Sequence, residues 1–283
     1  MVVNVTTPKN EELAKLHELE IKIALEIKRV CEKHQIKYFL AFGSLLGAIR
    51  HQGFIPWDDD LDIGMLRDDY ERFIRVFNKE TDSKIFFMEN WDTEPCYGHS
   101  FTKIKLNNTV FEEYSISKTN THKGIFVDVF PFDSLVDNPQ EIRQFEKRIR
   151  FFRMLYKFKL GYRPTNPSDK SQLLFSKLFW FVGLFVKRSW IKKCLFSQET
   201  KYNGLQPTPP NVVLASGARR CKDYFDRNYL NDTIEVTFDG VQFAVPKEYH
   251  IVLTRMYGDY MQLPPVEQRT FRHSAMYINF GPY

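Results

Sequence analysis

The decapeptide PWDDDLDIGM, residues 56–65, places four carboxylates within five positions and then returns to apolar residues. Like charges at this density repel one another, and an acidic loop in solvent rarely alternates with leucine and isoleucine. Successive side chains of a strand point to opposite faces. If the strand begins as early as Asp58, then Asp58, Asp60 and Asp62 would share one face while Leu61 and Ile63 point into a core. The fold must therefore supply a positive charge for this face.

A divalent cation suits this pattern. Neighbours on one face of a strand lie about 6–7 Å apart, a spacing that one or two Mg²⁺ ions can bridge. Mg²⁺, or Mn²⁺ in its place, is usually held by a few carboxylates and by substrate phosphates. Asp60 and Asp62, with Asp58 beside them, are thus interpreted as a metal platform for phosphate chemistry. The competing interpretation is a solvated acidic turn that caps a helix.

Two features elsewhere in the chain favour the metal site. Gly43 and Ser44 end a short apolar strand and begin a helix, where backbone N–H groups suit a phosphate oxygen, although Gly-Ser pairs also make simple turns. Asp128 lies between two valines in the apolar stretch 124–130, and burial of its carboxylate is costly without a partner. A cation shared with the acidic segment would be that partner. A hydrogen-bonded aspartate, or an edge position that faces water, is the alternative.

The hydrophobic pattern predicts a mixed α/β or α+β fold. Strands are expected at residues 37–42, 61–65, 84–90, 101–107 and 124–130. Helices are expected at residues 8–34, 44–51 and 247–258. Another helix is expected from Asp68, which forms a capping-box pattern with Glu71. A late β-hairpin is expected over residues 232–246, with Asp239 and Gly240 at its turn.

Three regions are expected along the chain. Residues 1–137 would form the catalytic core, and residues 206–283 would complete it with the hairpin and the last helix. Residues 138–205 form a helical insertion that is rich in aromatic and basic residues. Within it, residues 173–196 mix large apolar side chains with lysines. This segment would either lie in a membrane interface, where it could bind the acceptor, or pack its phenylalanines and tryptophans against the sheet.

Composition argues against several classes of protein. The net charge of +5 comes from dispersed basic residues, which suits an anionic ligand or membrane surface but not a nucleic-acid partner. The four cysteines lie far apart, unlike a zinc finger or a disulfide framework, and fit a reducing compartment. No signal peptide is evident, and the longest apolar run, residues 178–186, falls short of the roughly 20 residues of a membrane span. The expected location is the cytoplasm, with peripheral contact at the inner face of the cytoplasmic membrane.

A Gly-Ser turn, a D-x-D strand and a third carboxylate on a later strand are the pattern of the nucleotidyltransferase fold shared with DNA polymerase beta. A narrower resemblance is to the LicD family, which includes fukutin and the fukutin-related protein. Residues 42–65 resemble that family's central motif almost throughout. Later blocks resemble it in the same order, at residues 101–111, 124–133, 238–249 and 257–265. The helical insertion has no match.

The resemblance implies a metal-dependent transferase that moves a phospho-alcohol from a CDP-activated donor to a sugar hydroxyl of a glycan or lipid-linked glycan, with release of CMP. Phosphocholine from CDP-choline, on lipopolysaccharide or teichoic acid, is the first expectation and ribitol phosphate the second. The resemblance also implies that Asp60, Asp62 and Asp128 hold Mg²⁺, with Asp58 as an additional or outer-shell ligand. Asp128 would either accept the proton of the incoming hydroxyl or hold a second metal.

Ten further residues are candidate contacts for the substrates: Gly43, Ser44, Arg50, His51, Trp57, Lys103, Lys105, Arg269, Arg272 and His273. The Gly-Ser pair, the Arg-His pair and the two lysines would contact phosphate, unless the last four simply face solvent. Trp57 is the first candidate for an aromatic cage around the quaternary ammonium of choline. The last three residues would either close over the anionic donor or form a mobile basic tail.

Two other functions fit the same residues less well. The first is nucleotidyl transfer from an NTP, which would release pyrophosphate in place of CMP. The second is a catalytically silent scaffold that binds a glycan or a membrane. A silent scaffold would be expected to have lost a carboxylate, and none of Asp60, Asp62 and Asp128 is missing.

Overall fold

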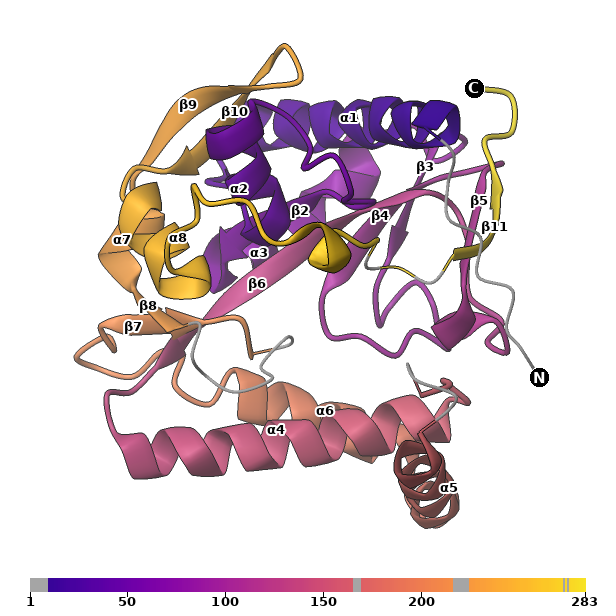
Figure 1. Cartoon of the computed structure of the whole chain (residues 1–283). Coiled ribbons are helices and arrows are strands. Elements are labelled where there is room, and N and C mark those ends of the chain that lie inside the picture. Colours follow the sequence, from indigo (N-terminus) through magenta and orange to yellow (C-terminus); the bar gives the residue numbers. More distant parts are fainter. Residues whose placement is uncertain (1–9, 165–168, 216–223, 272, 274) are drawn as a thin grey trace.

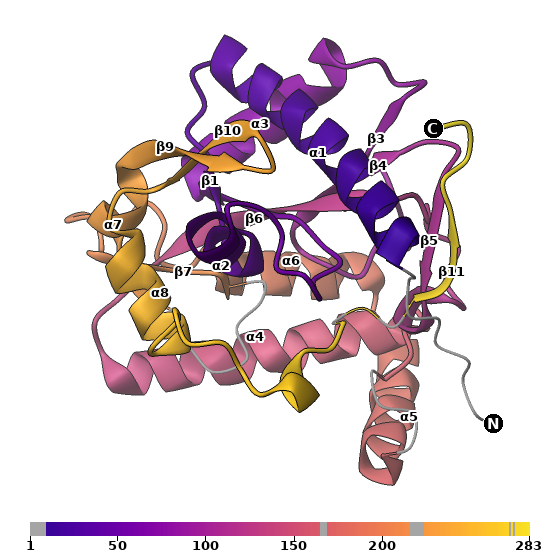
Figure 2. The same ribbon diagram turned by 45° about the horizontal axis from the view of Figure 1, so that its top comes forward.

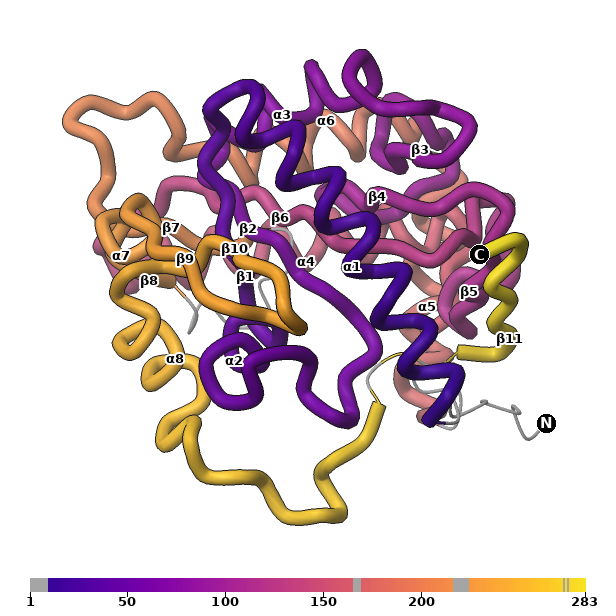
Figure 3. The backbone as a smooth tube through the Cα atoms, turned by 90° about the horizontal axis from the view of Figure 1, so that it is seen from above, coloured from indigo at the N-terminus to yellow at the C-terminus, as the bar shows by residue number. Residues whose placement is uncertain are grey.

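The structure is a computed structural model and describes residues 10–164, 169–215, 224–271, 273 and 275–283. A mixed sheet runs through the centre of the molecule (Figure 1). Helices α1 (Asn10–Lys33) and α3 (Arg67–Glu80) cover one face, and α4 (Pro139–Lys159) lies on the opposite side (Figures 1 and 3). The predicted α+β class, with a mixed sheet between helices, is confirmed.

The central sheet has the strand order β1-β2-β6-β4-β3. The β2–β6 pair is parallel, and the other pairs along this path are antiparallel. These strands are β1 (Phe39–Leu40), β2 (Asp62–Leu66), β3 (Phe86–Glu89), β4 (Thr102–Leu106) and β6 (Phe126–Leu135). At one end of the sheet, β7 (Asn211–Val213) pairs with the last residues of β6, and β8 (Tyr224–Asp226) pairs with β7.

Strand β6 is buried along all ten of its residues. Strands that are covered on both faces are usually continuous apolar runs, and β6 follows this rule except at two carboxylates. Asp128 forms an ion pair with Lys103, and Asp133 forms one with Arg67. A buried carboxylate without a partner costs several kcal/mol, on the order of its desolvation penalty. The two cations therefore allow β6 to remain at the centre of the sheet.

Two smaller sheets complete the β structure. Strands β9 (Thr233–Phe238) and β10 (Val241–Pro246) form the late hairpin, as predicted. Its turn residues Asp239 and Gly240 have φ angles of 45° and 79°, the left-handed conformation of a type I′ turn. Strand β5 (Val110–Glu113) pairs with β11 (Ala275–Asn279). The sequence did not predict this pairing, because both strands are short and lie far apart in the chain.

The helical insertion contains α4, α5 (Lys170–Leu184) and α6 (Arg188–Glu199), as expected for this region. Helix α5 projects away from the rest of the molecule (Figure 2). The remaining helices are α2 (Phe42–His51), α7 (Arg227–Asn231), α8 (Tyr249–Tyr257) and two 3₁₀ turns, Tyr114–Ile116 and Val266–Gln268. None of the helices in the described part of the chain has the length and hydrophobicity that a bilayer-spanning segment requires. The division of the chain into three regions stays a prediction.

Three local predictions differ from the structure. The strand expected at residues 37–42 is reduced to β1, because Phe42 already begins α2. The capping box was wrong, since α3 is preceded by Leu66, which makes no capping hydrogen bond, and Asp68 lies inside the first turn. A carboxylate in that turn still interacts favourably with the helix dipole. Strand β6 continues to Leu135, past its expected end, because β7 pairs with its last three residues.

Candidate active site

Three neighbouring strands place Asp62, Asp128 and Lys103 in one row across the sheet. The parallel pairing of β2 with β6 sets Asp62 opposite Asp128, and the antiparallel pairing of β6 with β4 sets Asp128 opposite Lys103. Side chains at opposite positions on paired strands share a face of the sheet. The Nζ atom of Lys103 lies 2.7 Å from Oδ1 of Asp128, and both side chains are buried. The D-x-D segment and the distant Asp128 are thus neighbours.

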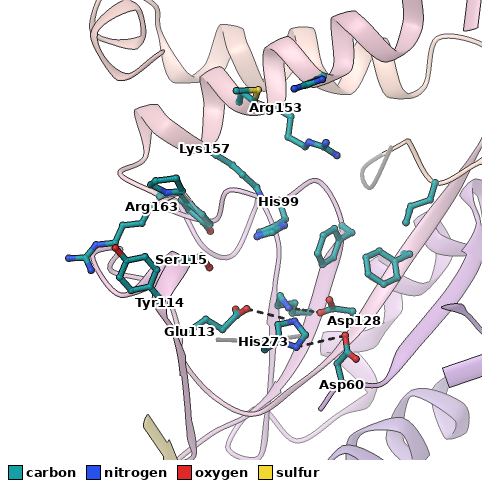
Figure 4. A pocket seen from close by; sticks show the side chains of 18 of the residues that line it. Asp60, His99, Glu113, Tyr114, Ser115, Asp128, Arg153, Lys157, Arg163 and His273 are labelled. Atoms are coloured by element: carbon teal, nitrogen blue, oxygen red, sulfur yellow. Dashed lines mark ion pairs between the residues drawn. The ribbon is translucent and has the colours of Figure 1, made fainter. Parts of the chain in front are cut away.

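A cavity of about 1130 Å³ opens over this row (Figure 4). Asp60, Asp62, Asp128 and Lys103 line it together with aromatic side chains, among them Phe42, Phe101 and Phe130. Its volume exceeds the roughly 300–1,000 Å³ that is usual for a site for one small molecule. The three predicted carboxylates therefore share one space that has room for a donor and part of an acceptor.

The three carboxylates fit a divalent cation in their chemistry. Burial raises the pKa of Asp62 well above its ordinary value, and Asp60 and Asp128 raise it further. Burial also raises the pKa of Asp128, although Lys103 opposes this change. A divalent cation prefers oxygen ligands and would offset the repulsion among them. Asp60, Asp62 and Asp128 are the residues that would hold it, and this role stays a prediction.

His273 lies beside the acidic segment and was predicted to contact the donor. Its Nδ1 atom is 3.1 Å from Oδ1 of Asp59. The same atom is 3.9 Å from Oδ2 of Asp60, and its Nε2 atom is 3.7 Å from Oε1 of Glu113 (Figure 4). The backbone N–H of His273 also donates to the Asp59 carboxylate. The pairing of Ala275 with Glu113 at the start of β11 brings His273 to this position. His273 is therefore part of the site and not part of a free tail.

The surroundings of His273 favour its charged form. Burial opposes its charge, but the hydrogen bond with Asp59 and the carboxylates of Asp60 and Glu113 raise its pKa well above the ordinary value. One oxygen each from Asp59 and Asp60 and one ring nitrogen of His273 lie within 4.8 Å of one another, a spacing that a metal ion could also use. A protonated imidazole is a donor and not a ligand. The geometry therefore favours ion pairs at this trio.

Two further carboxylates at the site were missed by the sequence analysis. Glu20 of α1 is only 2% exposed, and its pKa is raised well above the ordinary value by burial and then by Asp60 and Asp59. Glu113 lines the cavity, and there His273 and Lys103 lower its pKa although burial opposes this change. A sequence signal existed for Glu20, which lies on the apolar stripe of an amphipathic helix. None existed for Glu113, which depends on the β5–β11 pairing.

The wall opposite the carboxylates is basic. Arg150, Arg153 and Lys157 of α4 line the cavity together with Arg163 (Figure 4). Burial lowers the pKa of His99 well below its ordinary value, and Lys157 is the next largest cause. The positive charge of α4 thus acts within the cavity. The three α4 residues are spaced to share one helix face, a signal that was overlooked because the whole region is basic.

The predicted phosphate contacts at the start of α2 lie beneath the acidic segment. The hydroxyl oxygen of Ser44 accepts a hydrogen bond from the backbone N–H of Asp62 over 2.8 Å. A Cβ atom on Gly43 would lie 2.5 Å from Oδ2 of Asp58, so only glycine leaves room for that carboxylate. Gly43, Ser44 and Asp58 are absent from the described lining of the cavity. They support the strand that carries Asp62.

Lys105, Arg50 and His51 are absent from the described lining of the cavity. Lys105 forms a buried ion pair with Glu89 at 2.7 Å. Arg50 donates hydrogen bonds to His51 and to the carbonyl of Tyr260.

Trp57 and Arg269 also lie outside the described lining of the cavity. The guanidinium of Arg269 lies over the ring of Trp57 at 5.2 Å, and His51 meets the same ring edge-on. Arg272 lies outside the described residues. Contact of any of these side chains with the donor stays a prediction.

Comparison with known proteins identifies the family of this sequence. Residues 35–166 match the family model for the LicD/FKTN/FKRP nucleotidyltransferase domain. Lipopolysaccharide cholinephosphotransferase LicD of Haemophilus influenzae is 34% identical over 245 residues, which are 86% of this chain and 89% of that protein.

Two other relatives are similar over shorter stretches. Human ribitol 5-phosphate transferase FKRP is 50% identical over 40 residues, which are 14% of this chain and 8% of that protein. An uncharacterized protein of Rickettsia prowazekii is 42% identical over 165 residues, which are 49% of this chain and 62% of that protein. Because the similarity to the Haemophilus protein extends over most of both chains, the present chain belongs to the LicD family.

Proposed function

We propose that the protein transfers phosphocholine from CDP-choline to a hydroxyl of a cell-surface glycan, such as lipopolysaccharide or teichoic acid, or of its lipid-linked precursor, and releases CMP. The match to a lipopolysaccharide cholinephosphotransferase over most of both chains carries this proposal. The gathering of Asp60, Asp62 and Asp128 in one cavity supports it. The shorter match to ribitol 5-phosphate transferase supports phospho-alcohol transfer as the reaction class and makes ribitol phosphate the second candidate.

In the proposed reaction, the hydroxyl oxygen forms a bond to the choline-bearing phosphorus, and the bond from that phosphorus to the oxygen of CMP breaks. The hydroxyl proton passes to Asp128, whose pKa is raised by burial. Lys103, 2.7 Å away, orients this carboxylate and keeps a positive charge beside the reacting phosphate. Mg²⁺ or Mn²⁺, bound through Asp60 and Asp62, would supply charge neutralisation for the donor diphosphate.

Asp128 has a second candidate role as the third metal ligand, and metal binding separates the two roles. If Asp128 is the base, the variant Asp128→Asn binds Mg²⁺ in a calorimeter nearly as the wild type does but releases no CMP. If Asp128 is a ligand, the same variant loses both Mg²⁺ binding and CMP release. Asp62→Asn is expected to lose both in either case.

The basic wall of α4 suits the anionic part of the substrates. The acidic row alone would repel a diphosphate, whereas Arg150, Arg153 and Lys157 provide an attractive field on the other side of the same cavity. The CMP portion of the donor is therefore placed toward α4, with its diphosphate between the two walls. The acceptor hydroxyl approaches the same phosphate from the side of Asp128.

The test is incubation of the protein with CDP-choline, CDP-ribitol or CDP-glycerol, together with Mg²⁺ and candidate glycan acceptors, followed by measurement of CMP. CMP release with CDP-choline that depends on Mg²⁺ and on Asp62 is the expected result. A matched control is Asp137→Asn, an exposed carboxylate outside the cavity, which should retain full activity. Pyrophosphate release from an NTP without any CMP release would replace this function with nucleotidyl transfer.

We place the reaction in the cytoplasm. The three described cysteines, Cys31, Cys96 and Cys194, are free thiols, which is typical of a reducing compartment. Fractionation of cells that express the protein, with a cytosolic enzyme as marker, tests this location.

A further inference from the structure

Helix α5 exposes apolar side chains around most of its circumference. All fifteen of its residues are described, and only Gly183 is buried. Seven large apolar side chains in and just after α5 are exposed by half or more: Leu174, Phe175, Leu178, Trp180, Phe181, Leu184 and Phe185. A helix that is apolar all round is normally enclosed by protein or lipid. Contiguous exposed apolar surface of this kind marks an interaction site.

Within the described part of the chain, the contacts of α5 with α4 lie on one side of the helix. The ring of Phe179 lies 5.7 Å from that of Phe151 and 6.3 Å from that of Phe158 on α4. The carbonyl of Gly183 accepts a hydrogen bond from Lys159 over 2.5 Å. Helix α5 is thereby fixed to α4, and not to the sheet, and projects from the molecule (Figure 2). The described residues leave its other sides accessible to a partner.

The charge of the surrounding segment identifies the chemistry of that partner. Residues 170–198 contain six lysines or arginines and no aspartate or glutamate. Five of these cations are exposed: Lys170, Lys177, Lys187, Arg188 and Lys193. A second copy of the chain would bring an identical positive charge against this surface and be repelled. An anionic lipid headgroup layer over an apolar layer is complementary to both features.

We propose that α5 lies in the interfacial layer of an anionic bilayer. With fifteen residues, the helix is about 22 Å long, which is shorter than the roughly 30 Å hydrocarbon core. It would therefore lie along the surface, with Trp180, Phe181 and Phe185 among the acyl chains and its lysines at the phosphates. The longest apolar run of this segment, residues 178–186, is likewise too short to span a bilayer.

The position of α5 also connects the membrane to the active site. Ser171, Gln172 and Phe175 of α5 line the same cavity as the carboxylate row. A bilayer that holds α5 would hold one edge of the cavity at the membrane surface, where a lipid-linked glycan presents its hydroxyl groups. This second step rests on the proposed function, whereas membrane binding itself does not.

Vesicle flotation tests the proposal on the full chain. The wild type is expected to float with phosphatidylcholine vesicles that contain about 30 mol % phosphatidylglycerol and much less with phosphatidylcholine alone. Binding should weaken at about 0.5 M NaCl, because salt screens the headgroup attraction. The emission of Trp180 should shift to shorter wavelength on anionic vesicles, and Trp180→Phe should remove that shift.

Two double variants make the test specific. Phe181→Glu with Phe185→Glu alters exposed residues outside the cavity lining and should lower vesicle binding by about tenfold or more. Met261→Glu with Val266→Glu changes two equally exposed apolar residues elsewhere and should bind as the wild type does. Equal binding by both double variants, or a wild-type dimer in solution that only the α5 variant dissociates, would overturn the proposal.

Activity assays then separate this inference from the proposed function. The α5 variant should release CMP with a water-soluble glycan acceptor at the wild-type rate. With a lipid-linked acceptor in anionic vesicles, its rate should fall by about the factor lost in binding. Vesicle binding without CMP release from any acceptor would reject the proposed function and leave the membrane contact standing. Equal rates of CMP release by the wild type and the α5 variant on the lipid-linked acceptor would reject the connection between α5 and catalysis.

Discussion

Asp62 combines the properties expected of a metal ligand in this protein. It is buried, and burial, followed by the charges of Asp60 and Asp128, raises its pKa well above the ordinary value. A bound cation would offset this repulsion. Mg²⁺ is therefore expected to raise the melting temperature of the wild type. At about 100 times Kd the stabilisation would be about 2.7 kcal/mol.

The variant Asp62→Asn should lose this response. Without Mg²⁺ it should be at least as stable as the wild type, because one of three mutually repelling carboxylates is gone. Thermal denaturation with and without MgCl₂ measures both effects, and Asp137→Asn is the control. An equal Mg²⁺ response in wild type and Asp62→Asn would contradict the metal assignment.

Glu199 gives the stability of the protein a dependence on pH. Burial raises the pKa of this carboxyl group to about 8, from an ordinary value of 4.5. The unfolded chain releases its proton near the lower value, whereas the folded protein retains it up to the higher one. The free energy of unfolding should therefore fall as the pH rises from about 4.5 to about 8, by an amount on the order of a few kcal/mol.

Glu199→Gln removes this titration. The variant should be more stable than the wild type at pH 8 and should lose the fall between pH 5 and pH 8. Urea denaturation at several pH values checks this, with the exposed Glu11→Gln as control. If the free energy of unfolding depends on pH in the same way in the wild type and in Glu199→Gln, then Glu199 is not the titrating group.

At the scale of elements, strand β6 depends on Arg67 of α3. Two hydrogen bonds of 2.7 Å join the guanidinium to both oxygens of Asp133, which is fully buried. Arg67→Met would leave this carboxylate without its counter-charge and should cost about 3–5 kcal/mol. Adding Asp133→Leu should recover much of the loss, because no buried charge then remains. Chemical denaturation of the single and double variants decides this, and equal losses in both would show that the ion pair is unimportant.

Helix α4 is expected to control affinity for the donor. Arg153→Gln removes one charge from the cavity wall, and the KM for CDP-choline should rise about tenfold with a smaller effect on kcat. The dependence of kcat/KM on salt should also weaken. Arg148→Gln, on the exposed part of the same helix and outside the cavity lining, is the matched control. A change in kcat alone would argue against a binding role for α4.

At the scale of the whole molecule, residues near both ends of the described chain meet at the site. Glu20 comes from α1 and His273 from the segment before β11. His273→Gln should lower stability by about 1–3 kcal/mol, because Asp59 would lose a charged partner. Asp59→Asn should cost less in that background than in the wild type. A double-mutant cycle by thermal denaturation measures the coupling between His273 and Asp59. Strictly additive losses of stability would show that the two residues do not interact.

The sequence predicted those parts of the site that depend on local pattern. The alternation of residues 58–62 singled out Asp60 and Asp62, although the strand itself begins only at Asp62. The apolar surroundings of Asp128 indicated a buried partner. His273 was named, but its ion pairs were not, because they require the pairing of β5 with β11. The ion pair of Lys105 could not be predicted either. Its alternation with Lys103 suggested the same role for both lysines, but its partner Glu89 lies on the neighbouring strand β3. The local periodicity of a sequence does not indicate contacts between residues far apart in the chain.

The central position of β6 has a consequence for how long the site keeps its geometry. The backbone N–H of Asp128 donates to the carbonyl of Leu61 over 3.0 Å, and β6 is paired along both edges. Amides in such a strand exchange with solvent only when the whole domain opens. Hydrogen exchange at residues 127–129 should therefore be among the slowest in the protein. The spacing of the carboxylates would then persist for as long as the fold does, through every cycle of substrate entry and release.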